Sequence, residues 1–260
     1  MKVELSYPDL TDEEVKAVLA VLRSQYLSMG PRVSQFERDF AGYLGRRYAI
    51  AVNSGTSGLH LAVKSLGIKE GDEVITTSFS FVASSNCLLY EGAKPVFVDI
   101  EPVTLNLNPE LIEGAITDKT KAILVVDVFG YPVSMDPIIS LAKHYGLAII
   151  EDSCEALGSK IDDKMAGTES DIAVFAFYPN KQITTGEGGM IVTDREELAV
   201  ACSSMRNQGR GENGLWLHHE RLGYNYRLDE MSAALGIVQL KRIESIIEKR
   251  EKIARMYDER

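Results

Sequence analysis

Short apolar runs of strand length alternate with amphipathic stretches of helical length along most of this chain. The alternation predicts an α/β fold with a mainly parallel sheet flanked by helices, because parallel strands need helical crossovers between them. The apolar run Lys121–Val126 predicts a central strand that is buried on both faces. Further strands are predicted at Tyr48–Val52, Glu73–Thr77, Pro95–Val98, Leu147–Ile150, Ile172–Phe177 and Gly189–Thr193.

Amphipathic stretches before and between these strands predict helices. Near the N-terminus, Thr11 and Glu14 have the spacing of a capping box. The apolar face of the helix that follows would consist of Val15, Val18, Leu19 and Leu22. Further helices are predicted at Thr56–Leu66, Val82–Tyr90 and Pro137–Tyr145, and Asn207–Gly214 predicts a flexible loop. Asp229 could cap one long helix that runs through Ile247 towards the C-terminus.

The composition bounds the partners and the compartment. A formal net charge of −10 argues against nucleic acid or an anionic membrane as the main partner. The N-terminus lacks the pattern of a signal peptide, and no stretch approaches the roughly 18 apolar residues of a membrane span. Cys87, Cys154 and Cys202 are widely spaced and predict reduced, mostly buried thiols in a cytoplasmic protein. The 4 histidines lack metal-ligand spacing, so no metal site is predicted.

Lys181 is the residue with the clearest chemical meaning. It follows the apolar, aromatic strand Ile172–Phe177 and precedes the glycine-rich turn Gly186–Gly189. A lysine in such a place is a candidate for an amine held inside a cleft, where it can form a Schiff base with a carbonyl. The aldehyde of pyridoxal phosphate (PLP) is the carbonyl that such lysines most often bind in enzymes.

Two upstream segments could complete a PLP site. The turn Asn53–Gly58 lies between a strand and a helix, and its hydroxyl and N–H groups could bind a phosphate. It lacks the Gly-Lys-Ser/Thr of a P-loop, and an ordinary strand–helix turn remains the alternative. Asp152 ends an apolar strand and could pair with a pyridine nitrogen, or it could simply cap a helix. Phe81 could stack on a flat ring or belong to the core.

Several motifs together resemble a known family. They are Asn53–Thr56, Phe81–Asn86, Glu91–Val96, Glu151–Gly158, Lys181 with Gly186–Gly189, Arg206–Gly209 and Leu222–Arg227. In this order, over essentially the whole chain, they look like the nucleotide-sugar aminotransferases of the DegT/StrS group, which are fold-type I PLP enzymes. The resemblance implies a seven-stranded, mainly parallel sheet in a large domain at residues 1–230. It also implies the start of a small, apparently truncated C-terminal domain at residues 231–260.

By that resemblance Lys181 carries the cofactor, Asp152 pairs with its pyridine nitrogen and Phe81 stacks on its ring. The phosphate turn, with Gly55 at its centre, would bind through the backbone amides of Thr56 and Ser57.

The family's Gly-Tyr-Asn-Tyr-Arg segment reaches the neighbouring subunit's site. Asn225 or Arg227 would therefore contact the partner's cofactor in a homodimer with shared active sites. Two positions depart from the family pattern. Ala176 stands where many members have a serine that anchors the phosphate, and Glu155 stands where His or Gln is common and would border the cofactor. Two carboxylates as close as Asp152 and Glu155 require a cation or hydrogen bond to offset them.

The resemblance implies an enzyme that converts a keto group of a nucleotide-linked sugar to an amine, with L-glutamate as the amino-acid donor. One alternative is a PLP-dependent sugar dehydratase on the same scaffold. In that branch a histidine replaces the lysine, so Lys181 argues against it. Another alternative is a non-catalytic or incomplete relative that binds only the cofactor or a partner chain.

Overall fold

The computed structural model describes residues 7–211 and 217–260, and its centre is a seven-stranded sheet. The strand order is β1-β9-β8-β5-β4-β2-β3, and within the described part of this sheet β9 alone runs opposite to the other strands. The bounds are β1 (Tyr48–Val52), β2 (Glu73–Thr77), β3 (Lys94–Val98), β4 (Thr120–Val126), β5 (Ala148–Asp152), β8 (Ile172–Ala176) and β9 (Gly189–Thr193). A separate hairpin pairs β6 (Lys160–Ile161) with β7 (Lys164–Met165). The predicted α/β class and all seven sheet strands are confirmed.

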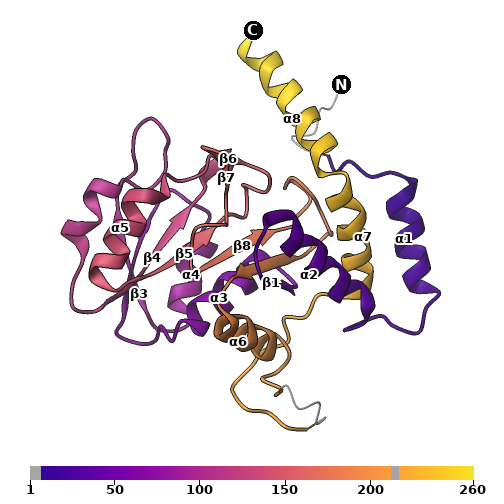
Figure 1. Cartoon of the computed structure of the whole chain (residues 1–260), viewed down its shortest axis with the longest axis horizontal. Coiled ribbons are helices and arrows are strands. Elements are labelled where there is room, and N and C mark those ends of the chain that lie inside the picture. The colour runs from indigo at the N-terminus through magenta and orange to yellow at the C-terminus, as the bar shows by residue number, and fades with distance from the viewer. Residues whose placement is uncertain (1–6, 212–216) are drawn as a thin grey trace.

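Helices cover both faces of this sheet (Figure 1). One face packs against α3 (Gly55–Ser65), α4 (Ala83–Leu89) and α6 (Glu196–Arg206). The opposite face packs against α2 (Pro31–Leu44), α5 (Met135–Tyr145), α7 (Glu230–Lys241) and the base of α8 (Ile243–Asp258). The short 3₁₀ turns are η1 (Pro109–Leu111), η2 (Glu113–Ala115) and η3 (Val128–Gly130). Helices α2 and α6 were not predicted from the sequence.

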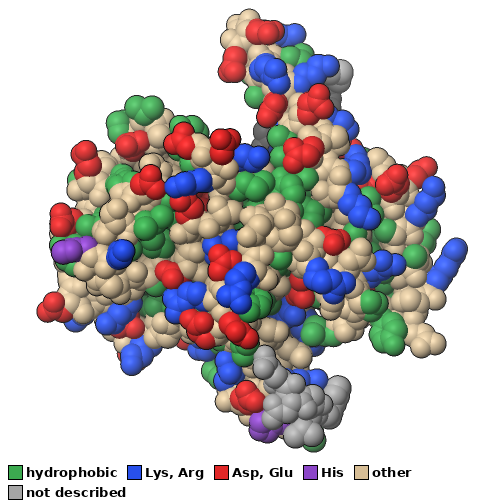
Figure 2. All heavy atoms as spheres, viewed as in Figure 1, with side chains coloured by type: hydrophobic (Ala, Val, Ile, Leu, Met, Phe, Trp, Pro, Cys, Tyr) green, Lys and Arg blue, Asp and Glu red, His purple; other side chains and the backbone are tan. Residues whose placement is uncertain are grey.

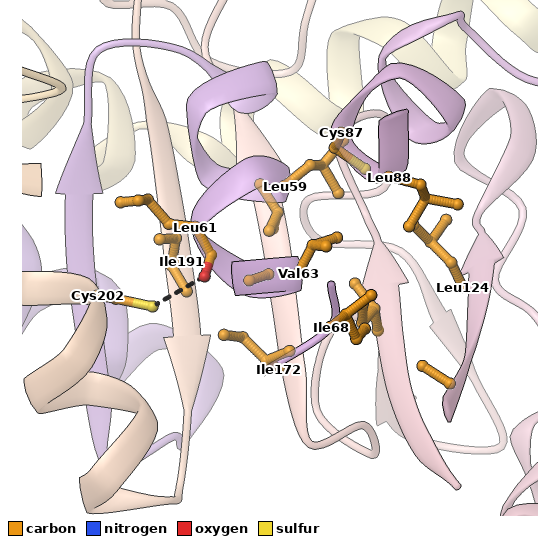
Figure 3. Close-up of a cluster of buried hydrophobic side chains, with 14 of the residues drawn as sticks. Leu59, Leu61, Val63, Ile68, Cys87, Leu88, Leu124, Ile172, Ile191 and Cys202 are labelled. Atoms are coloured by element: carbon orange, nitrogen blue, oxygen red, sulfur yellow. Dashed lines mark hydrogen bonds between the residues drawn. The ribbon is translucent and has the colours of Figure 1, made fainter. Parts of the chain in front are cut away.

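The strands supply apolar side chains alternately to the two faces, as their period of two requires. Val174 of β8, for example, belongs to the core under α3, whereas Phe175 belongs to the core under α2. Figure 3 shows the first of these cores, where Leu59 and Val63 of α3 meet Ile172 and Ile191 of the sheet. Burial on both sides explains why these strands read as nearly continuous apolar runs.

Helix α1 (Asp12–Leu22) has the predicted capping box. Its predicted apolar face is largely exposed, with Val15 55% and Leu22 54% exposed. The helix turns Glu14 and Val21 inward instead, and α7 is the neighbour against which it lies (Figure 1). The reason is electrostatic, because the Glu14 carboxylate accepts hydrogen bonds from Gln239 and Arg242 on the α7 side.

The single long helix predicted after Asp229 is also corrected, because it divides into α7 and α8 at Arg242. Arg242 has φ −99° and ψ 3°, and its N–H donates to Gln239 O at 3.1 Å, which makes a tight turn. Its guanidinium reaches Asp9 and Glu14, which holds the turn in place. Asp229 caps α7 as predicted, with its Oδ1 accepting from the Met231 and Ser232 N–H groups.

Helix α7 and the first turn of α8 belong to the same hydrophobic core as α2 and the sheet. Ala233, Ile237, Ile243 and Ile246 pack with α2 and β8, while residues 248–258 of α8 are exposed and protrude (Figures 1 and 2). The predicted division at residue 230 stays a prediction. Of the predicted loop Asn207–Gly214, residues 212–214 lie outside the described ones. Within the described residues no helix is long and apolar enough to cross a membrane.

Candidate active site

A cavity of about 750 Å³ lies at the edge of the sheet where the parallel strands end. Residues that follow β1, β2, β4, β5 and β8 line it, together with residues that precede the antiparallel β9. Open parallel sheets place ligand sites at this edge, since loops from several strands converge there. The lining includes Gly55, Thr56, Phe81, Asp127, Asp152, Glu155, Ala176 and Lys181. The structure therefore brings together residues that are up to 126 positions apart in the chain.

Lys181 reaches the cavity from the loop after β8. Its Nζ donates to Glu155 Oε1 at 2.9 Å, and its side chain is only 16% exposed. Glu155 follows β5, and its own side chain is 43% exposed. The ammonium of Lys181 is thus the cation that offsets the carboxylate of Glu155 beside Asp152. This contact also holds the lysine amine inside the cavity.

Asp152 lies at the end of β5 and is 6% exposed. Its Oδ2 accepts from Ser84 Oγ at 2.6 Å, and its Oδ1 accepts from the Cys154 N–H at 3.2 Å. Ser84 in turn pairs with Ser80 across 2.7 Å between their Oγ atoms. These bonds fix the orientation of the carboxylate at the cavity wall. Neither serine was singled out from the sequence, where nothing distinguishes a contact between residues 68 positions apart.

A second buried carboxylate, Asp127, was also missed. It follows β4 directly, so the signal was the same one that identified Asp152, a carboxylate at the end of an apolar strand. Asp127 Oδ2 accepts from Ser153 Oγ at 2.7 Å, and Oδ1 accepts from the Val133 N–H at 2.9 Å. Burial raises the pKa of Asp127 well above its ordinary value, and the charge of Glu151 raises it further. The raised pKa disfavours a negative charge on Asp127 at the cavity wall.

The first turn of α3 forms the wall nearest β9. Ser54 caps this helix, and its Oγ accepts from the Ser57 N–H at 3.0 Å, while its carbonyl accepts from the Gly58 N–H. The amides of Gly55 and Thr56 come earlier and have no acceptor within the helix. Both residues line the cavity, whereas Ser57 is buried behind it and bonds to Asn53. The Ser57 N–H thus has an acceptor within the chain, whereas the Gly55 and Thr56 amides face the cavity, and phosphate binding by Thr56 and Ser57 stays a prediction.

Glycines bring this turn close to the strands. A Cβ on Gly55 would lie 2.8 Å from Ala176 Cβ and 2.9 Å from Cys154 Sγ. A Cβ on Gly189 would lie 2.7 Å from the carbonyl carbon of Ser54 and 2.8 Å from Gly55 N. Side chains at these positions would push the turn away from the sheet. Ala176, which replaces the serine common in the family, adds a methyl group to the same wall.

Phe81 lies in the loop between β2 and α4 and lines the cavity. Its side chain is 77% exposed, so it is not a core residue. Phe79 is also partly exposed and makes an edge contact with Phe129, with ring centroids 5.9 Å apart. An exposed aromatic ring at a cavity is free to contact a planar ligand, and stacking by Phe81 stays a prediction.

Asn225 and Arg227 are not brought to this cavity. Their segment lies beside the edge strand β1, because Arg227 pairs with Val52 of that strand. Asn225 pairs with Asn207, which follows α6. Arg227 Nη1 donates to Asn207 Oδ1 at 3.0 Å, and Asn225 is exposed. The two residues therefore contribute nothing to the cavity of their own chain, as expected if they serve another copy.

The cavity residues fit PLP. The volume lies within the roughly 300–1,000 Å³ of cofactor sites. Lys181 offers an amine for the aldehyde and Asp152 a buried carboxylate for the ring nitrogen. Gly55 and Thr56 offer N–H groups at a helix start for the phosphate. Among the described residues no cluster suited to a metal ion is found. Fold and cavity together define a PLP-dependent transferase of the α/β type.

The chain belongs to the DegT/DnrJ/EryC1/StrS aminotransferase family, whose model matches residues 8–260. This is a family of PLP-dependent sugar aminotransferases, which confirms the resemblance drawn from the motifs. The match covers the cavity, all seven sheet strands and helix α8.

Several relatives support the same conclusion. GDP-perosamine synthase of Caulobacter vibrioides is 40% identical over 260 residues, which are 100% of this chain and 70% of the relative. The solved structure of Helicobacter pylori PseC, an aminotransferase involved in the biosynthesis of pseudoaminic acid, matches with a TM-score of 0.96 at 37% identity. It covers 100% of this chain and 70% of PseC. Spr1654 of Streptococcus pneumoniae in its PLP form has a TM-score of 0.93 at 30% identity and covers 100% of this chain and 71% of Spr1654.

Proposed function

We propose that this protein transfers an amino group from L-glutamate to a keto group of a nucleotide-linked sugar. The observation that carries the proposal is the entry of Lys181 Nζ into the cavity that Asp152 and the start of α3 also line. A relative that is a GDP-perosamine synthase supports a nucleotide-linked sugar as the substrate class. When bound, PLP supplies the electron sink that makes a proton on the reacting carbon removable.

The side chains of the cavity have separate tasks. The Lys181 amine would hold the cofactor through its aldehyde and, when free, would accept and return a proton at Nζ. Asp152, held by Ser84 and desolvated, favours a proton on the ring nitrogen because opposite charges attract strongly where water is excluded. The amides of Gly55 and Thr56 would bind the phosphate. The exposed ring of Phe81 would stack on the cofactor ring.

Glu155 keeps the lysine in place before it reacts. Its Oε1 is 2.9 Å from Lys181 Nζ, so the amine is already inside the cavity. Glu155 is 43% exposed, and this partly solvated pair can separate at a lower cost than a buried one. The contact therefore orients the amine without trapping it.

The visible absorption spectrum tests this proposal most directly. Adding PLP to the protein should produce an absorption band of the lysine-bound cofactor, and borohydride should fix the cofactor to Lys181, which peptide mass spectrometry identifies. Adding L-glutamate should then bleach the band. A band that forms but ignores glutamate would point to another donor, and no band at all would favour the alternative of a non-catalytic relative.

A product assay separates amination from dehydration. Incubation with a nucleotide-linked keto-sugar and glutamate should yield an amino sugar and 2-oxoglutarate in equal amounts. Loss of a sugar hydroxyl without transfer of nitrogen would instead identify a dehydratase. Lys181 favours amination, because the dehydratase branch carries a histidine at that position.

We further propose that two copies share their active sites. Asn225 is exposed and lies outside its own cavity, yet the aromatic residues on either side of it are anchored, with Tyr226 OH 3.1 Å from His60 Nδ1. The segment thus presents Asn225 outward in a fixed place. Mixing inactive Lys181→Ala with impaired Asn225→Ala protein should restore activity, because a mixed dimer contains one intact site. Subunit exchange without recovery would contradict shared sites.

A further inference from the structure

The loop that carries Lys181 is held at its base and at its tip, and between them Gln182 Nε2 donates to Glu155 O of the neighbouring loop. At its base, the Thr185 N–H donates to Phe177 O at 3.0 Å, and the Thr184 N–H donates to Gln239 Oε1 of α7 at 3.3 Å. At its tip, the Lys181 N–H closes a turn on Tyr178 O at 2.9 Å. These bonds leave the carbonyls of the tip to be fixed by another element.

That element is α8, through Arg250. Arg250 Nη2 donates to Asn180 O at 3.1 Å and also to Lys181 O. One guanidinium nitrogen therefore binds two successive backbone carbonyls, that of Asn180 and that of Lys181, whose amine enters the cavity. Within residues 7–211 and 217–260 no ion pair joins Arg250 to a carboxylate, so its charge acts on these carbonyls. Partial burial lowers the pKa of Arg250, which remains a cation at neutral pH.

The same face of α8 also contacts the loop of Glu155. Ile247, one turn before Arg250, lies against Gly158, where a Cβ would come within 2.3 Å of Ile247 Cδ1. Gly158 has φ +86° and comes three residues after Glu155, the partner of Lys181. Ile243 and Ile246 anchor the base of α8 in the core. One anchored helix face thus touches both loops whose side chains form the Lys181–Glu155 pair.

We propose that Arg250 is a positioning residue for Lys181, and that α8 holds the lysine loop against the Glu155 loop so that the amine enters the cavity correctly oriented. The inference rests on the proposed role of Lys181 as the lysine that binds the cofactor. Arg250 itself contacts only the backbone of the loop. Its side chain therefore affects the binding of the cofactor indirectly, by orienting the Lys181 side chain.

A comparison of two cofactor forms tests this role. The PLP aldehyde condenses with a lysine amine and releases water, whereas pyridoxamine phosphate has no aldehyde and cannot form this bond. In Arg250→Met, which keeps the aliphatic stem and loses the donors, the Kd for PLP should rise about tenfold. The Kd for pyridoxamine phosphate should change less than about twofold, because its phosphate and ring contacts remain. Equilibrium dialysis measures both, and borohydride trapping on Lys181 should slow in parallel.

Two variants serve as controls. Arg255→Met removes an arginine from the exposed half of the same helix, where it pairs only with Glu251 among the described residues, and both Kd values should stay unchanged. Arg250→Lys keeps a charged donor and should recover part of the PLP affinity, which also provides a test if Arg250→Met fails to fold. Equal weakening of both ligands, or of neither, would overturn the inference. A wild-type protein that binds the two forms equally would refute the assignment of Lys181 itself.

Discussion

Gly189 offers a sharp test of the phosphate-binding turn, because a single methyl group at this position meets backbone atoms only. In Gly189→Ala the new Cβ would lie 2.7 Å from both the carbonyl carbon and oxygen of Ser54, and 2.8 Å from Gly55 N. Backbone atoms cannot rotate away, so either the turn or strand β9 has to move. Strand β9 is paired on both sides, with β1 and β8, whereas the turn borders the cavity. We expect the turn to yield.

The magnitude follows from the overlap. Overpacking of this kind costs about 1–3 kcal/mol, and about 1.4 kcal/mol corresponds to a tenfold change in an equilibrium constant. A turn that moves takes the Gly55 and Thr56 amides away from the phosphate. The Kd for PLP should therefore rise about 5- to 150-fold, and the Kd for inorganic phosphate should rise with it.

The assay is a PLP titration followed by visible absorption, with thermal unfolding of the cofactor-free protein measured beside it. The matched control is Gly42→Ala in α2, where a Cβ meets nothing within 4 Å. That change should leave PLP affinity unchanged and raise stability by about 0.5–1 kcal/mol, because alanine is the better helix former. If Gly189→Ala lowers stability but keeps the wild-type Kd, the strand moved instead, and the reasoning that the turn yields is refuted.

Three further predictions concern single side chains. Lys181→Ala should abolish turnover and borohydride labelling, and a variant with normal turnover would contradict the assignment. Asp152→Asn keeps the shape of the side chain and an oxygen for the Ser84 bond but loses the charge, so kcat should fall about 10- to 100-fold with an unchanged circular dichroism spectrum; full activity would remove the charge from the mechanism. Burial alone would raise the pKa of Glu14, but hydrogen bonds from Thr11, Gln239 and Arg242 lower it from 4.5 to about 2. The folded-state pKa is below the unfolded one, so the carboxylate stabilises the fold above pH 4.5 and this contribution is lost as the pH falls towards 2. A shift of this size corresponds to about 3 kcal/mol. Denaturant titrations at neutral pH should show that Glu14→Gln loses this contribution, while exposed Glu13→Gln should not.

The strands and the position of the lysine could be predicted from sequence because their signals are local. A strand buried on both faces is a short apolar run whatever it pairs with, so Lys121–Val126 and Gly189–Thr193 were predicted at or within one residue of β4 and β9. Lys181 and Asp152 stand directly after such runs, and the ends of parallel strands meet at one edge of a sheet. From that rule the two residues could be predicted to lie close together at this edge of the sheet.

The orientation of elements could not be predicted in this way. An apolar stripe shows that a helix is amphipathic but not which face has a partner, and in α1 the buried position belongs to Glu14 because Gln239 and Arg242 offer it hydrogen bonds. The break between α7 and α8 at Arg242 also depends on a distant contact, since the Arg242 guanidinium pairs with Glu14 of α1. Neither cause is visible within the segment that it affects.

By itself, the sequence identified the residues that we propose to carry the chemistry: a lysine, a carboxylate and a glycine-rich turn at strand ends. Only the tertiary structure decided what surrounds them. Glu155 meets Lys181 across 26 positions, and Arg250 meets the same loop across 69. The physical reason is that hydrogen bonds and burial depend on distance in space, and the packing of whole helices against the sheet sets those distances.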